Sequence, residues 1–113
     1  MDCVFCRIAA GSLAADVVYS DEDFLVFRDI HPLAPVHDVL IPKRHIPSVN
    51  GLTDADRALA GKMLLAAKKV AEQEGLAEKG YRLCINCGPD GTQAVPHLHL
   101  HILGGRLLSA ELG

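Results

Sequence analysis

The sequence lacks an excess of positive charge and lacks any long apolar run. Its 11 lysines and arginines are outnumbered by 14 aspartates and glutamates, which gives a net charge of −3. A broad cationic surface for DNA or RNA is therefore not expected. No apolar stretch approaches the ~20 residues that cross a bilayer as a helix. We expect neither a nucleic acid nor a membrane as a partner.

The N-terminus also lacks the basic start and the apolar core of a signal peptide. It reads MDCVFCRIAAGS and carries an acid at its second position. This absence predicts a cytoplasmic protein. In that reducing compartment the four cysteines should be thiols or metal ligands rather than disulfides.

The length and composition are those of an ordinary folded domain. The chain has 113 residues, of which 50% are hydrophobic and 22% charged. A chain of this length suits a single domain, and we place that domain at residues 1–113. The composition is globular rather than disordered.

The N-terminal part predicts a short helix followed by three strands, over residues 3–10, 17–20, 24–29 and 38–43. Asp2 is the expected cap of the helix, and Gly11 follows its last turn. The acidic turn at 21–23 joins the first two strands as a hairpin. The segment 30–37 contains two prolines and is expected to be a loop.

The C-terminal part predicts a long helix and two further strands, over residues 81–87 and 97–103. The helix begins at Thr53, which forms a capping box with Asp56, and runs about six turns to a stop at Gly75. The resulting fold class is α+β. It is a mainly antiparallel five-stranded sheet with one long and one short helix, both packed on one face.

The last predicted strand reads HLHLHI and carries half of the six histidines. Because side chains alternate along a strand, His97, His99 and His101 share one face, and the aliphatic residues between them face inward. The histidine face fits a polar surface, a metal site with a His-x-His pair, or nucleophilic catalysis by one imidazole. The strand alone does not separate the last two.

The glycine-rich turn GPDGTQ, residues 88–93, comes just before the histidines. Gly88 and Gly91 allow backbone N–H groups to turn toward an anion. Such a turn is usually only a hairpin connection, but beside an imidazole nucleophile it suggests a cradle for a phosphate. Asn86 precedes the turn and has an amide that can donate to it.

Two pairs of cysteines have the spacing of zinc ligands. Cys3 and Cys6 lie on the predicted short helix, where the alternative is a small apolar face. Cys84 and Cys87 lie on a predicted strand, where residues three apart face opposite sides. The first pair is therefore the favoured metal site.

The histidine segment, preceded by Gln-Ala-Val at 93–95 and followed by Gly-Gly-Arg at 104–106, resembles the histidine-triad (HIT) family. FRDIHPLAPVHDVLIPKRHI, residues 27–46, is similar to a second motif of the same family. The likeness covers nearly the whole chain. Within the family, the sequence most resembles the branch of Hint-like purine nucleoside phosphoramidases.

This resemblance implies hydrolysis of the P–N bond of purine nucleoside 5′-phosphoramidates. A covalent nucleotidyl-histidine would form, and water would release an AMP- or GMP-type nucleotide. The resemblance also implies a homodimer. In it the long helix and strand 81–87 contact the same elements of the second copy, and the two sheets join into one. Hydrolysis of dinucleoside polyphosphates, as in the Fhit-like branch, and nucleotide or zinc binding with incidental turnover are the alternatives.

The catalytic residues that the resemblance implies are His99, His101 and His37. His99 would be the nucleophile, with its second nitrogen bonded to a backbone carbonyl so that the attacking nitrogen is unprotonated. His101 would donate to a phosphate oxygen. His37, which the sequence places in a loop, would join the same constellation.

The substrate-binding residues implied by the resemblance are Asp29 for the ribose hydroxyls and two further sets. Those for the base are Leu13, Phe27 and Ile30, and those for the phosphate or leaving group are Asn86, Thr92 and Gln93, beside His99 and His101. Ala94 departs from the family, in which many members have a serine there. A hydroxyl that bonds the phosphate or leaving group is therefore missing.

Some bacterial-type relatives hold a structural zinc, and the matching positions here are Cys3, Cys6, His45 and His97. Four such ligands close a tetrahedral site. The zinc would tie the short helix to the histidine strand and is not required for the chemistry.

Overall fold

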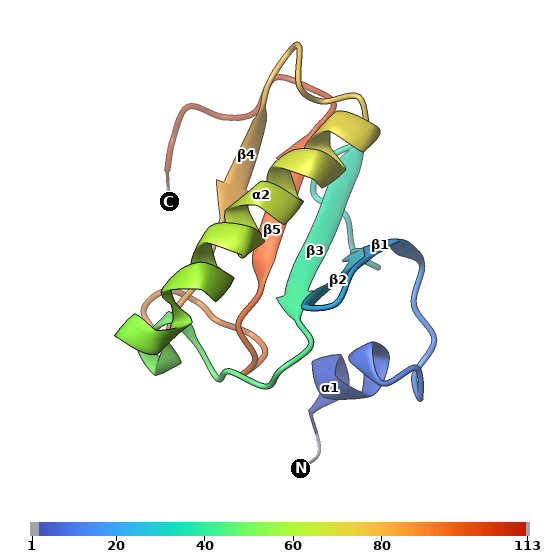
Figure 1. Ribbon diagram of the computed structural model, residues 1–113. Helices are drawn as coiled ribbons and strands as arrows, with labels where there is room; N and C mark the ends of the chain where they lie inside the picture. Colours follow the sequence, from blue (N-terminus) through green and yellow to red (C-terminus); the bar gives the residue numbers. More distant parts are fainter. Residues whose placement is uncertain (1–2, 113) are drawn as a thin grey trace.

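The computed structural model describes residues 3–112, and its elements are shown in Figure 1. In chain order they are α1 (Val4–Ala9), β1 (Val17–Ser20), β2 (Phe24–Arg28), β3 (Val36–Pro42), α2 (Arg57–Gln73), β4 (Tyr81–Cys84) and β5 (Leu100–Gly104). Asp2, the expected cap of α1, lies outside the described residues. Within them Cys3 caps this helix, because its sulfur accepts the N–H of Cys6 at 3.4 Å.

The five strands form one sheet in the order β1-β2-β3-β5-β4, and every neighbouring pair is antiparallel. The predicted α+β class with a five-stranded antiparallel sheet is therefore confirmed. β3 is the middle strand of this sheet and pairs with β2 and β5. β4 pairs only with β5 and forms one edge of the sheet.

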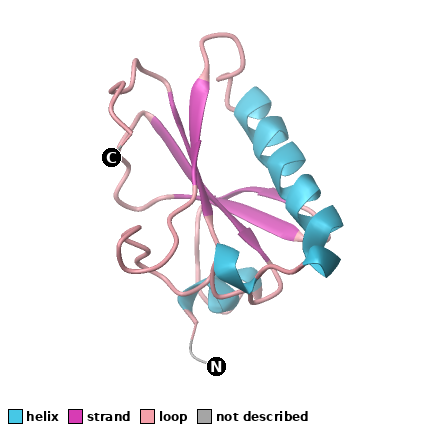
Figure 2. Ribbon diagram, turned by 90° about the vertical axis from the view of Figure 1, so that its left-hand side faces the viewer, coloured by secondary structure: helices cyan, strands magenta, loops and turns pink. Residues whose placement is uncertain are grey.

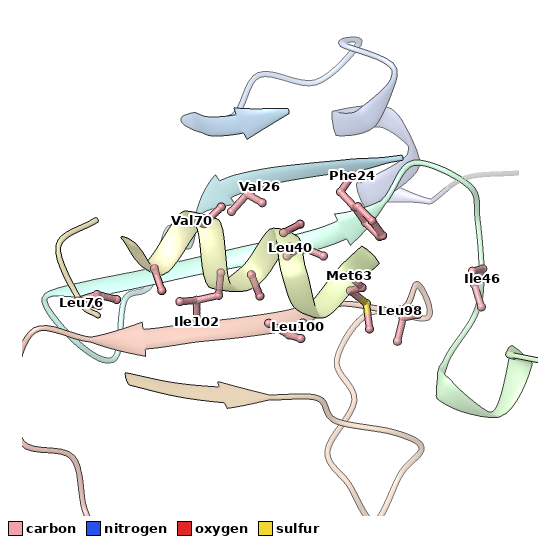
Figure 3. Close-up of a cluster of buried hydrophobic side chains, with 13 residues drawn as sticks. Phe24, Val26, Leu40, Ile46, Met63, Val70, Leu76, Leu98, Leu100 and Ile102 are labelled. Carbon is pink, nitrogen blue, oxygen red and sulfur yellow. The ribbon is translucent and has the colours of Figure 1, made fainter. Parts of the chain in front are cut away.

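Helix α2 covers one face of the sheet, as Figures 1 and 2 show. Its buried residues recur at intervals of three and four, which gives a single apolar stripe; they are Met63, Ala66, Ala67, Val70 and Ala71. Four of these are alanines or valine, so the helix lies close to the strands. Figure 3 shows this core, in which the strands contribute Phe24, Val26, Leu40, Leu100 and Ile102.

Helix α1 packs on the opposite face, so the prediction that both helices share one face is wrong. Leu25, Phe27, Val39 and Ile41 form a second buried cluster, against which Phe5, Ile8 and Ala9 of α1 pack. The reason is visible in β2 and β3, where every residue of the runs 24–27 and 39–41 is apolar and buried. A strand of that kind needs cover on both faces.

The start and end of α2 follow the predicted signals with a small shift. Thr53 and Asp56 form the capping box, but the first turn, Asp54–Asp56, is a 3-10 helix, and α2 begins at Arg57. Gly75 follows the helix with a positive φ of 77°, a backbone conformation that glycine adopts easily. The 17 residues of α2 make about five turns rather than six.

The histidine segment enters the sheet later than predicted. β5 begins at Leu100 rather than at residue 97, because Pro96 has no N–H and the N–H of His97 bonds back to Val95. The N–H of Leu98 bonds to the carbonyl oxygen of Ile46 in the loop after β3, at 2.6 Å. His97 and His99 therefore precede the strand, and only His101 lies on it.

Two other strand boundaries also differ from the prediction. β4 ends at Cys84 and does not reach residue 87. β3 begins at Val36, so His37 lies on this central strand and not in the preceding loop. In residues 3–112, neither helix is long and apolar enough to cross a membrane.

Candidate active site and metal centre

His99 is held by the backbone of its own segment. Its Nδ1 lies 2.7 Å from the carbonyl oxygen of His97. Because a carbonyl oxygen only accepts hydrogen bonds, Nδ1 must carry the proton, and in the neutral ring Nε2 has a free lone pair. The side chain is 5% exposed, and the ring of Phe5 packs edge-on at 5.2 Å between centroids. The backbone thus fixes one tautomer of a buried imidazole.

His37 and His101 meet across the β3–β5 pair. His37 Nε2 lies 2.9 Å from His101 Nδ1, and His37 Nδ1 accepts the N–H of Leu33 at 3.1 Å. Burial lowers the pKa of His37, against the opposing charge of Asp29. Burial, with His99 and His37 nearby, lowers the pKa of His101 to about 4. Both rings are therefore neutral near pH 7.

Asp29 lies just after β2 and is oriented from two sides. Its Oδ1 accepts the N–H of His31 at 2.8 Å, and its Oδ2 lies 3.4 Å from Nε2 of His37. Donor atoms of Asp29, His37 and His101 lie within 4.8 Å of one another, as a metal site requires. However, the Leu33 N–H occupies the Nδ1 lone pair of His37, so its Nε2 carries the proton and is not free to bind a metal.

The residues predicted to contact a base differ widely in exposure. Phe27 is only 6% exposed and packs against Phe5 of α1, with the ring centroids 5.5 Å apart. Ile30, next to Asp29, is 86% exposed, which is unusual for a large aliphatic side chain. Leu13, after α1, is half-buried.

The polar residues of the glycine-rich turn mainly brace the turn itself. The side-chain amide of Gln93 donates to Pro47 and Val95 and accepts from the N–H of Gly88. The N–H groups of Thr92 and Gln93 also bond inside the turn. Asn86 donates to the carbonyl oxygen of Gly91 at 2.8 Å and retains a second amide hydrogen. The backbone N–H groups of Gly88, Thr92 and Gln93 are therefore not available to an anion.

Cys3, Cys6, His45 and His97 gather at the end of β3, next to α1, with donor atoms within 4.8 Å of one another. His97 is fully buried, and its Nε2 donates to the carbonyl oxygen of Pro42 at 2.8 Å. Its Nδ1 is therefore unprotonated and lies 3.3 Å from the sulfur of Cys3 and 3.6 Å from that of Cys6. Nδ1 of His45 lies 3.3 Å from the Cys6 sulfur and 3.2 Å from Nδ1 of His97.

These separations fit a tetrahedral zinc ion. Bonds of about 2.0–2.3 Å from zinc to nitrogen and sulfur place neighbouring ligand atoms roughly 3.3–3.8 Å apart. Cys84 and Cys87, the rival pair, are free thiols and belong to no cluster of metal-ligating groups in residues 3–112. Cys84 lies opposite His101 in the β4–β5 register.

Two residues near the site escaped the sequence reasoning. Phe5 touches the rings of both His97 and His99, and its place between Cys3 and Cys6 was the available signal. Asp38, next to His37 on β3, is fully buried, and neither of its carboxylate oxygens has a hydrogen-bond partner. The pKa of Asp38 is raised from 3.8 to about 6, first by burial and then by the charge of Glu74.

Comparison with known proteins identifies the family to which this chain belongs. Residues 10–108 match the family described as the HIT domain. The chain belongs to the HIT family. The resemblance seen in the sequence is confirmed. His97, His99 and His101 are called the triad below.

Two relatives show how closely this HIT protein matches others over its length. It is 44% identical over 109 residues to a purine nucleoside phosphoramidase of Escherichia coli strain K12. The match covers 96% of this chain and 92% of the relative. The crystal structure of a HIT family hydrolase from Legionella pneumophila is 48% identical, with a TM-score of 0.97. That match covers 99% of this chain and all of the other.

A third relative bears on the metal centre. The crystal structure of a zinc-bound histidine triad family protein from Mycobacterium smegmatis is 34% identical to this chain. The match covers 94% of this chain and 76% of the other, with a TM-score of 0.78. Zinc binding within the family therefore agrees with the gathering of two cysteines and two histidines here.

Proposed function

We propose that this HIT protein is a hydrolase that cleaves the P–N bond of purine nucleoside 5′-phosphoramidates through a covalent nucleotide on His99. The observation that carries the proposal is the 2.7 Å hydrogen bond from His99 Nδ1 to the carbonyl oxygen of His97. In the neutral ring this bond leaves the lone pair on Nε2, the atom that would attack. The 44% identity to a purine nucleoside phosphoramidase supports the choice of substrate.

In the first step, Nε2 of His99 attacks the α-phosphorus and the amine leaves with the electrons of the old P–N bond. The amine takes up a proton from solvent as it leaves, a proton that the attacking water returns in the second step, and one P–N bond has replaced another. Water then attacks the same phosphorus, so the nucleoside monophosphate is released and His99 is regenerated. Splitting the reaction in this way replaces one difficult displacement by two easier ones.

His101 and His37 would support the phosphate rather than supply a charge. Both are neutral near pH 7, because burial lowers their pKa values. His101 would offer an N–H to a phosphate oxygen, an interaction of the kind that stabilises developing charge in a transition state. Asn86 retains an amide hydrogen for the same purpose. Thr92 and Gln93 would hold the turn that faces the phosphate.

The nucleoside would bind where Asp29 and Ile30 follow β2. Oδ2 of Asp29, which lies 3.4 Å from Nε2 of His37, would accept from ribose hydroxyls, while Oδ1 is held by the His31 N–H. Ile30 is exposed, so a purine ring would cover it and gain the free energy of apolar burial. Phe27 would form the floor of this slot and Leu13 its outer side.

We also propose a structural zinc bound by Cys3, Cys6, His45 and His97. The ligand separations and the unprotonated Nδ1 of His97 support it. When bound, zinc supplies a rigid closed link between α1 and the loops that lead to the triad. No step of the reaction uses it.

The whole chain would act as one cytoplasmic domain that pairs into a homodimer. β4 is a sheet edge, and two leucines, Leu64 on α2 and Leu83 on β4, are exposed to 54% and 36%. Burying such side chains against a second copy and pairing the β4 edges would remove both the leucines and the sheet edge from solvent.

Size-exclusion chromatography with light scattering tests the homodimer. It should give twice the mass of one chain, whereas a monomer at micromolar concentration would refute the pairing. None of the four cysteines is in a disulfide, and a reducing compartment would keep Cys3 and Cys6 available as zinc ligands.

Replacement of His99 by alanine tests the proposed function. We expect release of amine from an adenosine phosphoramidate to fall by at least about 10³-fold, while binding of AMP persists. His31→Ala is the matched control, because it removes an exposed histidine side chain for which the structure shows no hydrogen bond. Turnover of the His99→Ala variant at the wild-type rate would show that His99 is not the nucleophile.

A further inference from the structure

Arg106 lies outside the histidine cluster but is joined to it through a short chain of hydrogen bonds. Its guanidinium donates to the carbonyl oxygen of Leu33 at 2.9 Å and to that of Leu107 at 3.0 Å. The N–H of the same Leu33 donates to Nδ1 of His37, and His37 meets His101 at 2.9 Å. The arginine thus holds the residue that contacts His37.

The direction of these bonds follows from the chemistry of each group. An amide N–H only donates, so Nδ1 of His37 must be unprotonated, and in the neutral ring the proton is on Nε2. The bond to His101 therefore runs from His37 Nε2–H to His101 Nδ1. The opposite direction would place two donors, the Leu33 N–H and a His37 Nδ1–H, against each other.

His101 then has only one arrangement open to it. Because its Nδ1 accepts from His37, its own proton must be on Nε2. His99 has the opposite arrangement, with its proton on Nδ1 and its lone pair on Nε2. In their neutral forms, two neighbouring imidazoles thus present a lone pair on Nε2 of His99 and an N–H on Nε2 of His101.

The approach of Arg106 to the loop is built into the backbone. Gly105 has a positive φ of 94°, and a Cβ there would come within 2.9 Å of Cβ of Pro35. The positive φ of Gly105 and its closeness to Pro35, in the loop that carries Leu33, favour glycine at this position.

We infer that Arg106 is a positioning residue that, through the backbone of Leu33, fixes His37 and thereby His101 as Nε2–H tautomers. The tautomers follow from hydrogen bonds alone, whereas their consequence for turnover rests on the function proposed above. Without the guanidinium, the carbonyl group of Leu33 loses its partner, and the two peptide groups that meet at Leu33 are less restrained. His37 then loses the bond that selects its tautomer, and His101 loses its fixed donor.

Long-range ¹H–¹⁵N correlation spectra of the ¹⁵N-labelled, zinc-supplemented protein distinguish the two tautomers of each histidine. We expect Nε2–H for His37 and His101 in the wild type and a mixture of tautomers in Arg106→Met. Arg106→Lys keeps one donor and should restore part of the wild-type pattern. Arg82→Met is the matched control, because Arg82 also donates to a backbone carbonyl, that of Ser109, but does not touch the Leu33 loop.

A second pair of variants removes the donor itself. Leu33→Pro deletes the N–H, whereas Leu33→Ala removes only a side chain that is 71% exposed. We expect the tautomer mixture in the first and the wild-type spectrum in the second. This pair decides the matter if Arg106→Met folds poorly.

Turnover provides a separate readout. We expect kcat to fall about tenfold in Arg106→Met, the loss that corresponds to one hydrogen bond of ordinary strength. KM should change little, because Asp29 keeps its own bond to His31. An Nδ1–H tautomer of His37 in the wild type would overturn the inference, as would an Arg106→Met variant with wild-type tautomers. A wild type that does not hydrolyse phosphoramidates would defeat the proposed function but leave the tautomer result standing.

Discussion

Cys3 and His97 are 94 residues apart in the chain, yet the Cys3 sulfur lies 3.3 Å from Nδ1 of His97. The contact links the start of α1 to the first histidine of the triad. Since His97 also provides the carbonyl oxygen that bonds to His99, one ligand of the proposed zinc site also orients the proposed nucleophile. The proposed zinc site and the proposed catalytic residue are therefore linked through His97.

We expect purified wild-type protein to contain one zinc ion per chain, as measured by inductively coupled plasma mass spectrometry. Cys3→Ser should lose it, since serine is a poor zinc ligand, and the melting temperature should fall by at least about 5 °C, the shift that ~1 kcal/mol produces in a domain near this size. Cys84→Ser, a change of a thiol outside the cluster, should keep both zinc and stability. Zinc retained at full occupancy in Cys3→Ser would refute this ligand set.

Asp38 predicts an unusual dependence of stability on pH. The carboxyl is fully buried without a partner, while Arg28 pairs instead with Asp16 and Glu74 at 3.5 and 3.4 Å. The pKa in the folded state is about 6 against 3.8 ordinarily. The folded state therefore holds the proton more tightly, and stability is lost as the pH rises from about 4 through 6, up to roughly 3 kcal/mol.

The variant Asp38→Asn removes this dependence. Urea unfolding of both proteins at pH 5, 6, 7.5 and 8.5 should show the variant gaining on the wild type by about 1.4 kcal/mol between the lowest and highest pH. The comparison cancels any effect of pH on zinc binding that the two share. Asp90→Asn, at an exposed aspartate, should run parallel to the wild type. A constant difference between Asp38→Asn and wild type across this range would contradict the account.

Asp29 should select for the ribose hydroxyls. The wild type is expected to prefer a ribonucleoside phosphoramidate to its 2′,3′-dideoxy analogue by about 10- to 100-fold in kcat/KM, since hydrogen bonds to a charged acceptor are worth roughly 1.5–3 kcal/mol each. Asp29→Asn keeps an oxygen for the His31 N–H and should lose most of that preference. If both proteins discriminate equally, the ribose does not bind at Asp29.

The sequence allowed the elements and the sheet to be predicted because their patterns are strong. The apolar stripe of α2, the Thr53 capping box and the hairpin of β1 and β2 all appear as expected. The histidine alternation also places His97, His99 and His101 correctly on one side of the chain. These features depend on neighbours that are close in sequence.

The errors have a common physical origin in contacts between distant segments. His97 and His99 fall outside β5 because Leu98 pairs with Ile46, more than fifty residues earlier. α1 covers the second face because residues 24–27 of β2 are apolar on both sides of the sheet and α2 covers only one of them. The burial of Asp38 had no local signal, since an aspartate in a strand usually lies at an edge or in solvent.

The most direct test of the central claim is to trap the covalent intermediate. Wild-type protein mixed with an adenosine phosphoramidate is denatured within its first turnovers at neutral or alkaline pH, and its peptides are analysed by mass spectrometry. We predict a peptide that carries one added nucleoside monophosphate on His99, absent from the His99→Ala variant. Steady turnover with no such adduct, or an adduct on His37 or His101 instead, would contradict the account.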